Sequence, residues 1–330
     1  MMTRRESDSI GTMDVPEKAY YGVQTLRAKN NFKITGRPLH PEFIKNLARI
    51  KKAAAYTNMA AHVLDEEKGN AIVKACDEII AGKLHNQFIV DAIQGGAGTS
   101  ANMNANEVIA NIALKHMGFK PGDYEHCSSH DHVNRSQSTN DAYPTAIHMG
   151  MYASHLALVP HIKELIAAFR KKSEEFAHIV KMGRTQLEDA VPMTLGQTFS
   201  GFASILEAEL LHLDQAAADF LEVNMGATAI GTGICSEPGY AEKCVKALAE
   251  ITGWDITLAK DLVGVTSDTS CMIGYMSELK RIAVKMSKIS NDLRLLASGP
   301  RCGLAEINLP ARQPGSSIMP GKVNPVSPEV

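Results

Sequence analysis

The sequence has few aromatic residues and no excess of charge of either sign. Phenylalanine, tryptophan and tyrosine make up only 5% of the 330 residues, whereas hydrophobic residues together make up 45%. Alanine, leucine, isoleucine and methionine carry most of the hydrophobicity, which favours packed helices over β-sandwiches. The formal net charge of −2 argues against a dedicated nucleic-acid-binding protein, because such a protein needs a basic face. This net charge is still compatible with a local cationic pocket.

Nothing in the sequence indicates a disulfide framework, a signal peptide or a membrane span. No Cys-x-x-Cys pair occurs, and the cysteines are scattered along the chain at Cys76, Cys127, Cys235, Cys244, Cys271 and Cys302. This pattern favours buried thiols in a reducing cytosol. The N-terminal segment lacks the apolar core of a signal peptide, and no window reaches the roughly 18 consecutive apolar residues of a membrane helix. We therefore predict a cytoplasmic protein.

Long helical patterns dominate the second half of the chain, at about 141–178, 194–223 and 267–298. In the second pattern, apolar residues recur at steps of three or four and form one stripe, at Phe202, Leu206, Leu210, Leu213, Ala217 and Phe220. Helices of about 30 residues are about 45 Å long, which predicts a mainly α protein with a long helical bundle. Alanines on the other faces favour an oligomeric bundle over a monomeric one.

The two parts of the chain differ in pattern, and this predicts two regions. Residues 1–139 combine turn-rich stretches with shorter helices and are interpreted as a mostly helical N-terminal domain. Residues 140–330 contain the long patterns and are interpreted as a central domain of long helices. Between the two, the polar stretch 121–141 has almost nothing apolar to bury and is expected to be a surface loop or a loop that lines a site.

Polar, turn-rich segments next to helices are the candidate functional elements. They are "GGAGTSANMNANE" (95–107), "NRSQSTND" (134–141), "KMGRTQLEDAVPMT" (181–194) and "GSSIMPGKVNP" (315–325). Helix N-termini carry unpaired N–H groups and a partial positive charge, so they attract carboxylates. For each segment taken alone, ordinary helix capping is the favoured interpretation. Four such segments, three of them leading into long helical runs, favour a site for an anionic ligand.

These segments resemble the shared motifs of the aspartase/fumarase superfamily. "GSSIMPGKVNP" is similar to its signature loop, and "GGAGTSANMNANEVIAN", "RSQSTNDAYPTA" and "GATAIGTGI" are similar to its other blocks, in the same order. Within the superfamily, "KMGRTQLEDAVPMTLGQ" and "SGPRCGLAEINLP" are most similar to the aspartate ammonia-lyase branch. The resemblance implies three mostly helical domains, a homotetrameric central bundle, active sites shared between subunits, and reversible deamination of L-aspartate to fumarate and ammonia.

The resemblance also implies roles for individual residues. Ser316 is expected to be the general base that removes a Cβ proton, and the carbanion is stabilised by the neighbouring carboxylate. Lys322 and Asn324 are expected to hold the α-carboxylate, and Asn140 and Thr185 to lie near the amino group. The hydroxyls around the β-carboxylate are expected to come from Thr99, Ser138, Thr139 and Ser317. Capping remains an alternative for Asn140 with Asp141, and an ordinary turn hydroxyl for Thr185.

Position 186 distinguishes between two reactions within this superfamily. Fumarases and some aspartases have histidine in the block that reads "GRTQL" here, where the residue is Gln186. Departing hydroxide needs an acid, whereas an alkylammonium group already carries its proton and leaves as neutral ammonia. Glutamine is neither an acid nor a base, but it accepts a hydrogen bond from –NH3⁺. Gln186 therefore favours ammonia elimination, with fumarate hydratase as the nearest alternative.

Other functional classes receive less support from the sequence. No metal-ligand set is evident, since His126, His130 and His132 share a loop without a cysteine or paired acidic residues at ligand spacing. No Rossmann or P-loop fingerprint occurs, so no cofactor is expected. An inactive helical scaffold is the alternative from another class, but Ser316 and Lys322 are both present. The resemblance further implies that relatives continue past residue 330 into another central helix and a C-terminal domain.

Overall fold

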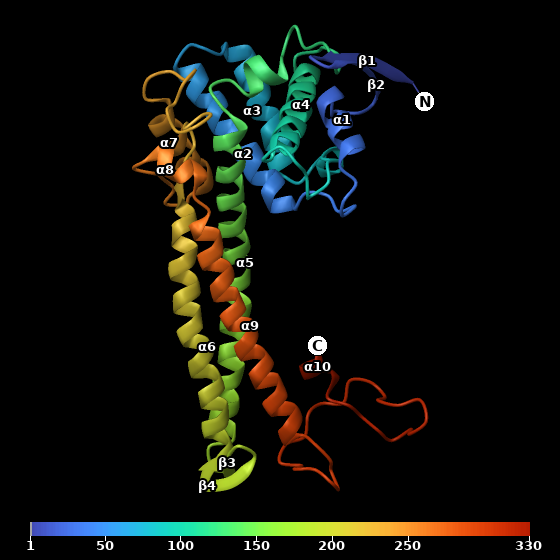
Figure 1. Ribbon diagram of the computed structural model, residues 1–330, viewed down its shortest axis with the longest axis vertical. Coiled ribbons are helices and arrows are strands. Elements are labelled where there is room, and N and C mark those ends of the chain that lie inside the picture. Colours follow the sequence, from blue (N-terminus) through green and yellow to red (C-terminus); the bar gives the residue numbers. More distant parts are fainter. Residues whose placement is uncertain (1) are drawn as a thin grey trace. The chain divides into compact units, whose positions relative to one another are not determined.

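The computed structural model describes residues 2–330, which form two compact units. One unit comprises the residues up to His155 together with Ala217–Thr269, and the other comprises Leu156–Ala216 together with Ser270–Val330. Helices dominate both units, and the strands of the described residues form three two-stranded sheets (Figure 1). The predicted mainly α fold is thereby confirmed. The predicted boundary between residues 139 and 140 falls at the start of a helix, and that division into domains stays a prediction.

The first unit is built around helices that pack on one another and share one hydrophobic core. Its helices are α1 (Val23–Asn31), α2 (Pro41–Ala60), α3 (Glu66–Ile80), α4 (Thr99–His116), the first part of α5 (Thr139–Glu175), α7 (Tyr240–Thr252) and α8 (Leu262–Ser267). Helix α2 packs against α3 and α7, and α3 packs against α4. Every residue from Ala101 to Leu114 is buried, so α4 lies at the centre of this unit.

Shorter elements complete the first unit. They are the antiparallel hairpin β1 (Thr3–Asp8) and β2 (Gly11–Pro16), the parallel pair β5 (Glu222–Val223) and β6 (Thr257–Leu258), two 3₁₀ turns (His85–Gln87 and Asp219–Leu221) and a π-helix (Ser129–Val133). The π-helix lies within the stretch 121–141 that was predicted to be loop. Val133 and Asp141 in this stretch are buried, and α5 begins within it at Thr139, so of the two alternatives a surface loop does not describe the whole stretch.

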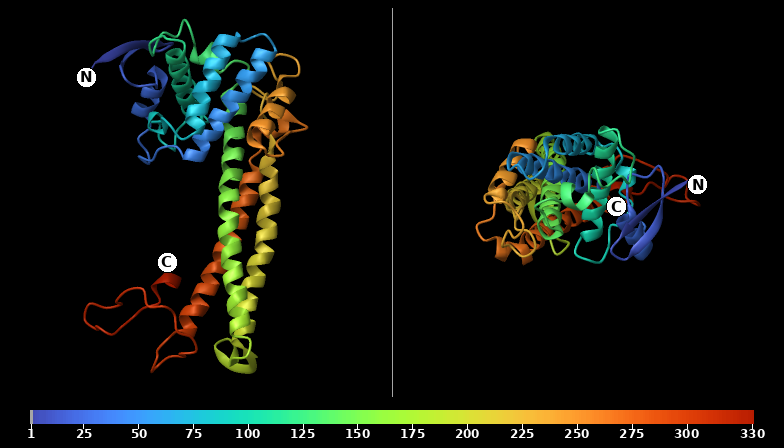
Figure 2. Two further views of the ribbon diagram at one scale, coloured as in Figure 1. Left: turned by 180° about the vertical axis from the view of Figure 1, so that it is seen from behind. Right: turned by 90° about the horizontal axis from the view of Figure 1, so that it is seen from above.

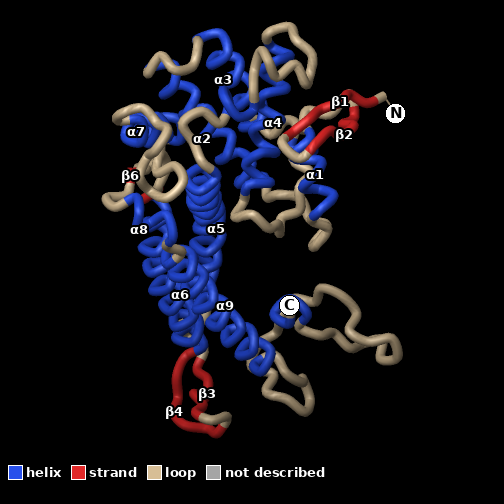
Figure 3. The backbone as a smooth tube through the Cα atoms, turned by 45° about the horizontal axis from the view of Figure 1, so that its top comes forward, coloured by secondary structure: helices blue, strands red, loops and turns tan. Residues whose placement is uncertain are grey.

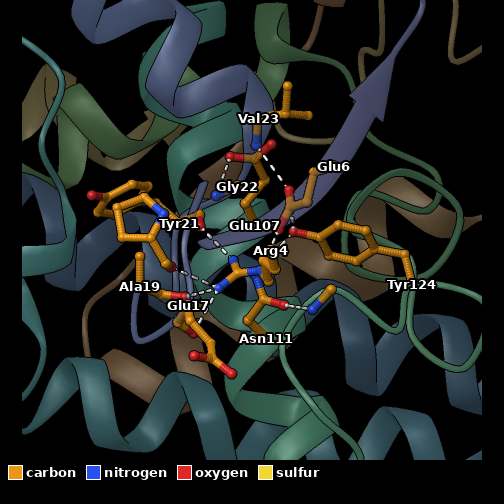
Figure 4. A network of polar contacts seen from close by, with 12 residues as sticks. Arg4, Glu6, Glu17, Ala19, Tyr21, Gly22, Val23, Glu107, Asn111 and Tyr124 are labelled. Carbon is orange, nitrogen blue, oxygen red and sulfur yellow. Dashed lines mark hydrogen bonds and ion pairs between the residues drawn. The ribbon is translucent and has the colours of Figure 1, made fainter. Parts of the chain in front are cut away.

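Two buried acidic residues attach the N-terminal hairpin and α1 to α4 (Figure 4). Glu107 of α4 accepts hydrogen bonds from the backbone N–H groups of Gly22, Gln24 and Thr25, the first at 2.8 Å. Glu6 accepts one from the backbone N–H of Val23 at 2.9 Å. The free N–H groups at the start of α1 are thus satisfied by carboxylates, which also suit the positive end of a helix. Arg4 donates to the backbone carbonyls of Pro16, Glu17, Ala19 and Tyr21.

The carboxylate of Asp91 organises the turn that precedes α2. It accepts hydrogen bonds from the backbone N–H groups of Ile93, Thr35 and Gly36, at 2.8–2.9 Å, and from the Thr35 hydroxyl at 2.7 Å. These donors, the Ile93 N–H first among them, hold the pKa of Asp91 well below its ordinary value of 3.8. The loop is therefore held by an ionised carboxylate at neutral pH.

The second unit contains the rest of α5, together with α6 (Leu195–Ala218) and α9 (Ser270–Leu296), which run side by side (Figures 1 and 2). Phe169 of α5 packs against Phe199 and Phe202 of α6, with ring centroids 5.7–6.1 Å apart. Buried Glu209 of α6 forms ion pairs with Arg281 and Lys285 of α9. The three predicted long helices are confirmed, and the observed bounds differ from the predicted ones only near the ends.

The remaining elements of the second unit connect or follow its long helices. Strands β3 (Val180–Thr185) and β4 (Glu188–Thr194) form an antiparallel hairpin between α5 and α6. After α9 the chain runs as an extended loop to the short helix α10 (Val326–Glu329), as Figure 3 shows. Lys181 and Arg184 of β3 form ion pairs with Glu306 of this loop, at 3.2 and 2.5 Å. These ion pairs tie the hairpin to the segment that leads into the "GSSIMPGKVNP" stretch.

Candidate active site

Four of the predicted site residues gather where α4 and α5 begin, within the first unit. Thr99 is the first residue of α4, and Thr139 is the first residue of α5. Gly98 lies directly against the ring of Tyr143 in α5, and Asn102 of α4 donates to the Thr139 hydroxyl at 3.2 Å. Both helix N-termini therefore lie in one region, where their unpaired N–H groups and positive dipole ends suit a carboxylate.

Ser138 and Asp141 cap the start of α5. The Ser138 hydroxyl accepts from the Asn140 N–H at 3.2 Å, and the Asp141 carboxylate accepts from the Ser138 N–H at 2.9 Å. This arrangement differs from a capping box in one bond, because the serine hydroxyl accepts from the N–H of Asn140 and not from that of Asp141. The capping alternative therefore applies to Ser138 and Asp141, and Ser138 is held in place by it.

Asp141 also binds the glycine-containing loop 224–229 to the start of α5. Its carboxylate accepts from the backbone N–H of Thr228 at 2.9 Å and of Gly226 at 3.3 Å. Burial raises the pKa of Asp141 to about 6, against these hydrogen bonds, which favour the charged form. Asn140 donates from Nδ2 to the carbonyl of Ala229 at 2.8 Å. Its Oδ1 thus faces away from that carbonyl and can accept a hydrogen bond from an ammonium group.

The other predicted residues lie in the second unit. Thr185 and Gln186 are at the tip of the β3–β4 hairpin and are exposed. Gln186 and Leu187 form its two-residue turn with φ angles of 53° and 69°. Both residues therefore occupy the left-handed region that side chains other than glycine seldom adopt, and such strain concentrates at functional sites. The sequence pattern contains no glycine that would have revealed this turn.

Ser316 lies in an irregular loop, and its hydroxyl faces two backbone donors. Ser316 Oγ accepts from the N–H groups of Ile318 and Met319, at 3.2 and 3.1 Å. Hydrogen bonds to the oxygen favour its charged form and lower the free energy of an alkoxide. The loop thus supplies two backbone donors to this hydroxyl.

The loop 315–325 is closed at its base. The Gly315 N–H donates to the Lys322 carbonyl at 2.8 Å, and Asn324 Nδ2 donates to the Gly315 carbonyl at 3.2 Å. Lys322 and Asn324 line a cavity of about 680 Å³ beside the end of α9, with Arg294 on its helical side. Two cations thus line this cavity, which suits an anionic group. Ser317 is exposed in the same loop.

A buried lysine and a buried asparagine lie behind the start of α5, and the sequence pattern did not predict their burial. Lys51 has no exposed surface, and Asn102 is 1% exposed. Lys51 Nζ donates to Asn102 Oδ1 at 2.7 Å, and burial lowers the pKa of this lysine to about 7. The only hint in the sequence is a lysine between the alanines and isoleucines of α2 and a run of asparagines in α4, which periodicity alone does not distinguish from surface positions.

Among residues 2–330, the structure has neither a membrane-spanning helix nor a grouped set of metal ligands. No helix is both long and apolar enough to cross a membrane. No three His, Cys, Asp or Glu side chains in this part of the chain are grouped so that they could hold a metal ion. His126 instead stacks on Phe119 with ring centroids 3.8 Å apart.

The class of protein follows from the match of nearly the whole chain to one family. Residues 11–330 match the family described as Lyase, and the chain belongs to this family. Aspartate ammonia-lyase of Pseudomonas aeruginosa is 56% identical over 330 residues, which cover 99% of this chain and 70% of that protein. Aspartate ammonia-lyase of Bacillus subtilis is 53% identical over 327 residues, which cover 99% of this chain and 69% of that protein.

Solved structures share the fold. A fumarate lyase:delta crystallin from Brucella melitensis, bound to cobalt, has a TM-score of 0.98 and 54% identity, covering 99% of this chain and 72% of that one. The class II fumarase of Schistosoma mansoni has a TM-score of 0.94 at 34% identity, with the same coverage of both chains. The superfamily resemblance predicted from the motifs is thereby confirmed.

Proposed function

We propose that the protein is an aspartate ammonia-lyase that converts L-aspartate reversibly into fumarate and ammonia. The placement of Ser316 Oγ against the N–H groups of Ile318 and Met319 carries this proposal, because it suits a serine that works as a base. The relatives named aspartate ammonia-lyase support the substrate, since their identity to this chain extends over nearly all of it.

The reaction requires removal of a proton from carbon, which is the difficult step. Ser316 alkoxide takes the proton from Cβ, and the electron pair moves into the β-carboxylate to give a doubly charged intermediate. Hydroxyl groups of Thr99, Ser138, Thr139 and Ser317 and the two helix N-termini stabilise this developing charge. The electron pair then returns to form the double bond while the C–N bond breaks.

The amino group leaves as ammonia without needing a proton from the enzyme. Asn140, Thr185 and Gln186 accept hydrogen bonds from the substrate –NH3⁺, whereas Lys322 and Asn324 hold the α-carboxylate. Support for Asn140 comes from its amide, whose Nδ2 is occupied by the Ala229 carbonyl. The product ammonia carries away the electron pair of the broken bond, so the charges balance.

The assembly is proposed to be a cytoplasmic homotetramer whose active sites combine segments of several subunits. Exposed apolar side chains on the helices of the second unit support association, since Leu211, Ile273 and Val284 are 66%, 65% and 62% exposed. In this arrangement residues 1–139 form the N-terminal domain, and 140–330 belong to the central one. The segments bearing Thr139, Gln186 and Ser316 then need not meet within one chain.

Product formation from two substrates tests the proposal. The purified protein is incubated with L-aspartate and separately with L-malate, and fumarate is followed by its ultraviolet absorbance. Fumarate from aspartate is expected, and fumarate from malate alone would instead establish a hydratase.

A pair of adjacent serines provides a matched test of the base. Ser316→Ala is expected to lower kcat by about 10²–10⁴-fold or more, because general-base catalysis is lost. Ser317→Ala is expected mainly to raise KM, because it removes a carboxylate contact. Circular dichroism should be unchanged for both. Near-normal kcat in Ser316→Ala would reject Ser316 as the base.

A further inference from the structure

A buried lysine lies behind the N-terminus of α5 and is surrounded by amide oxygens. Lys51 Nζ donates to Asn102 Oδ1 at 2.7 Å, to Asn134 Oδ1 at 2.9 Å and to Gln137 Oε1 at 2.9 Å. An ammonium group has three N–H donors, so the three amide oxygens use all of them. No carboxylate of the described residues contacts this nitrogen directly.

Backbone carbonyl groups determine how two of these amides are oriented. Asn134 Nδ2 donates to the carbonyl of Gln137 at 3.1 Å. Gln137 Nε2 donates to the carbonyls of Val133 and Arg135, at 3.0 and 3.1 Å. Because a carbonyl only accepts, the nitrogen of each amide must face it, and the oxygen must face Lys51.

The orientation of Asn102 follows from these neighbours. Its Oδ1 faces the Lys51 ammonium, which only donates, and its Nδ2 faces Asn134 Oδ1 at 3.2 Å, which only accepts. Nδ2 also lies 3.2 Å from the Thr139 hydroxyl. Asn102 must therefore donate to Thr139, and the Thr139 oxygen must accept.

A hydroxyl that accepts from one side has its own proton available for another acceptor. No residue in the part of the chain that the structure describes accepts the proton of Thr139. We propose that Asn102 is a positioning residue that fixes Thr139 as a hydrogen-bond donor toward the substrate carboxylate, with Lys51 and Asn134 holding Asn102 in that orientation. This inference rests on the proposed function, in which Thr139 contacts the β-carboxylate.

The substitution Asn102→Asp reverses this polarity with almost no change in shape. A carboxylate cannot donate, so the Thr139 proton turns toward residue 102 and its oxygen lone pairs face the substrate. The neighbouring Lys51 ammonium pairs with the new charge and keeps it compensated. KM for aspartate is expected to rise by about 10- to 100-fold, as for a lost hydrogen bond to a charged group, and kcat is expected to fall as well, because the same hydroxyl stabilises the charge that develops on the β-carboxylate.

A double-mutant cycle separates the hydroxyl from other effects of the added charge. Asn102→Asp is measured in the parent protein and in the Thr139→Val variant. If the effect passes through the hydroxyl, Asn102→Asp changes KM little in the Thr139→Val background. Equal increases of KM in both backgrounds would overturn the inference, because charge repulsion would then explain them.

A second variant serves if Asn102→Asp does not fold, as judged by circular dichroism. Asn102→Ala removes the donor without adding a charge, and it is expected to raise KM by about 3- to 10-fold in the parent protein only. An increase that persists in Thr139→Val would again reject the proposal. If the parent protein does not release fumarate from aspartate, the proposed function itself is wrong. If the parent is active but the substitutions at Asn102 and Thr139 have additive effects on KM, only the role of Asn102 is wrong.

Discussion

The close approach of Gly98 to Tyr143 gives a prediction whose magnitude follows from the structure. Gly98 precedes α4 with φ at +90°, and a Cβ atom there would lie 2.4 Å from Cγ and Cδ2 of the Tyr143 ring. Gly96 has a similar φ of +85°, but a Cβ atom there would meet only Thr99 Cβ, at 4.0 Å. The two glycines therefore share the backbone conformation and differ in the space around them.

Replacing each glycine by alanine separates backbone strain from steric overlap. The positive φ is expected to cost alanine about 1–2 kcal/mol at either position, and forcing a methyl group against Tyr143 adds about 1–3 kcal/mol. Gly98→Ala should therefore lower the free energy of unfolding by about 2–5 kcal/mol, and Gly96→Ala by about 1–2 kcal/mol. The smaller flexibility of the unfolded alanine chain affects both variants equally and cancels in the comparison.

Urea denaturation followed by far-ultraviolet circular dichroism measures both variants. The reasoning is refuted if Gly98→Ala unfolds at the same urea concentration as Gly96→Ala. Activity supplies a second readout, because displacement of the segment at Gly98 moves Thr99 away from the start of α5. KM for aspartate should therefore rise more in Gly98→Ala than in Gly96→Ala.

Three further predictions concern other parts of the molecule. Glu306→Gln removes the charge shared by Lys181 and Arg184 and should lower stability by about 1–3 kcal/mol, and an unchanged melting temperature would contradict this. Because the pKa of Asp91 is depressed in the folded protein, its carboxylate gives its full stabilisation above the ordinary value of 3.8, and this contribution is lost progressively as pH falls from that value through the lower pKa of the folded state. The melting temperature of Asp91→Asn should lie below that of the parent at neutral pH, and the gap should narrow in strong acid. Leu187→Gly relieves about 1–2 kcal/mol of left-handed backbone strain but loses about 0.5–1 kcal/mol because the unfolded chain becomes more flexible. A slightly higher melting temperature is therefore expected, and a large decrease would contradict this prediction.

Much of the architecture is predictable from periodicity. The long helices follow from apolar residues at steps of three and four, and the observed α5, α6 and α9 agree with them. The polar segments were expected at helix starts, and Thr99 and Thr139 are indeed the first residues of α4 and α5. These features depend on local spacing and capping, which neighbouring residues in the sequence decide.

Burial of polar groups was not predictable in the same way. Lys51 and Asn102 look like surface residues in the sequence, yet both are buried and face each other across two helices. The strained turn at Gln186 and Leu187 likewise carries no glycine signal. Such positions depend on partners that are distant in sequence, and only packing brings those partners together.

The sequence by itself determined the helical class, the lengths of the bundle helices and the family to which the chain belongs, because all three reside in local patterns of residue type. Tertiary structure alone decided which amide oxygens surround Lys51 and which way Asn102 faces Thr139. The physical reason is that hydrogen-bond polarity is set by the nearest donors and acceptors in space, and those come from separate helices and loops.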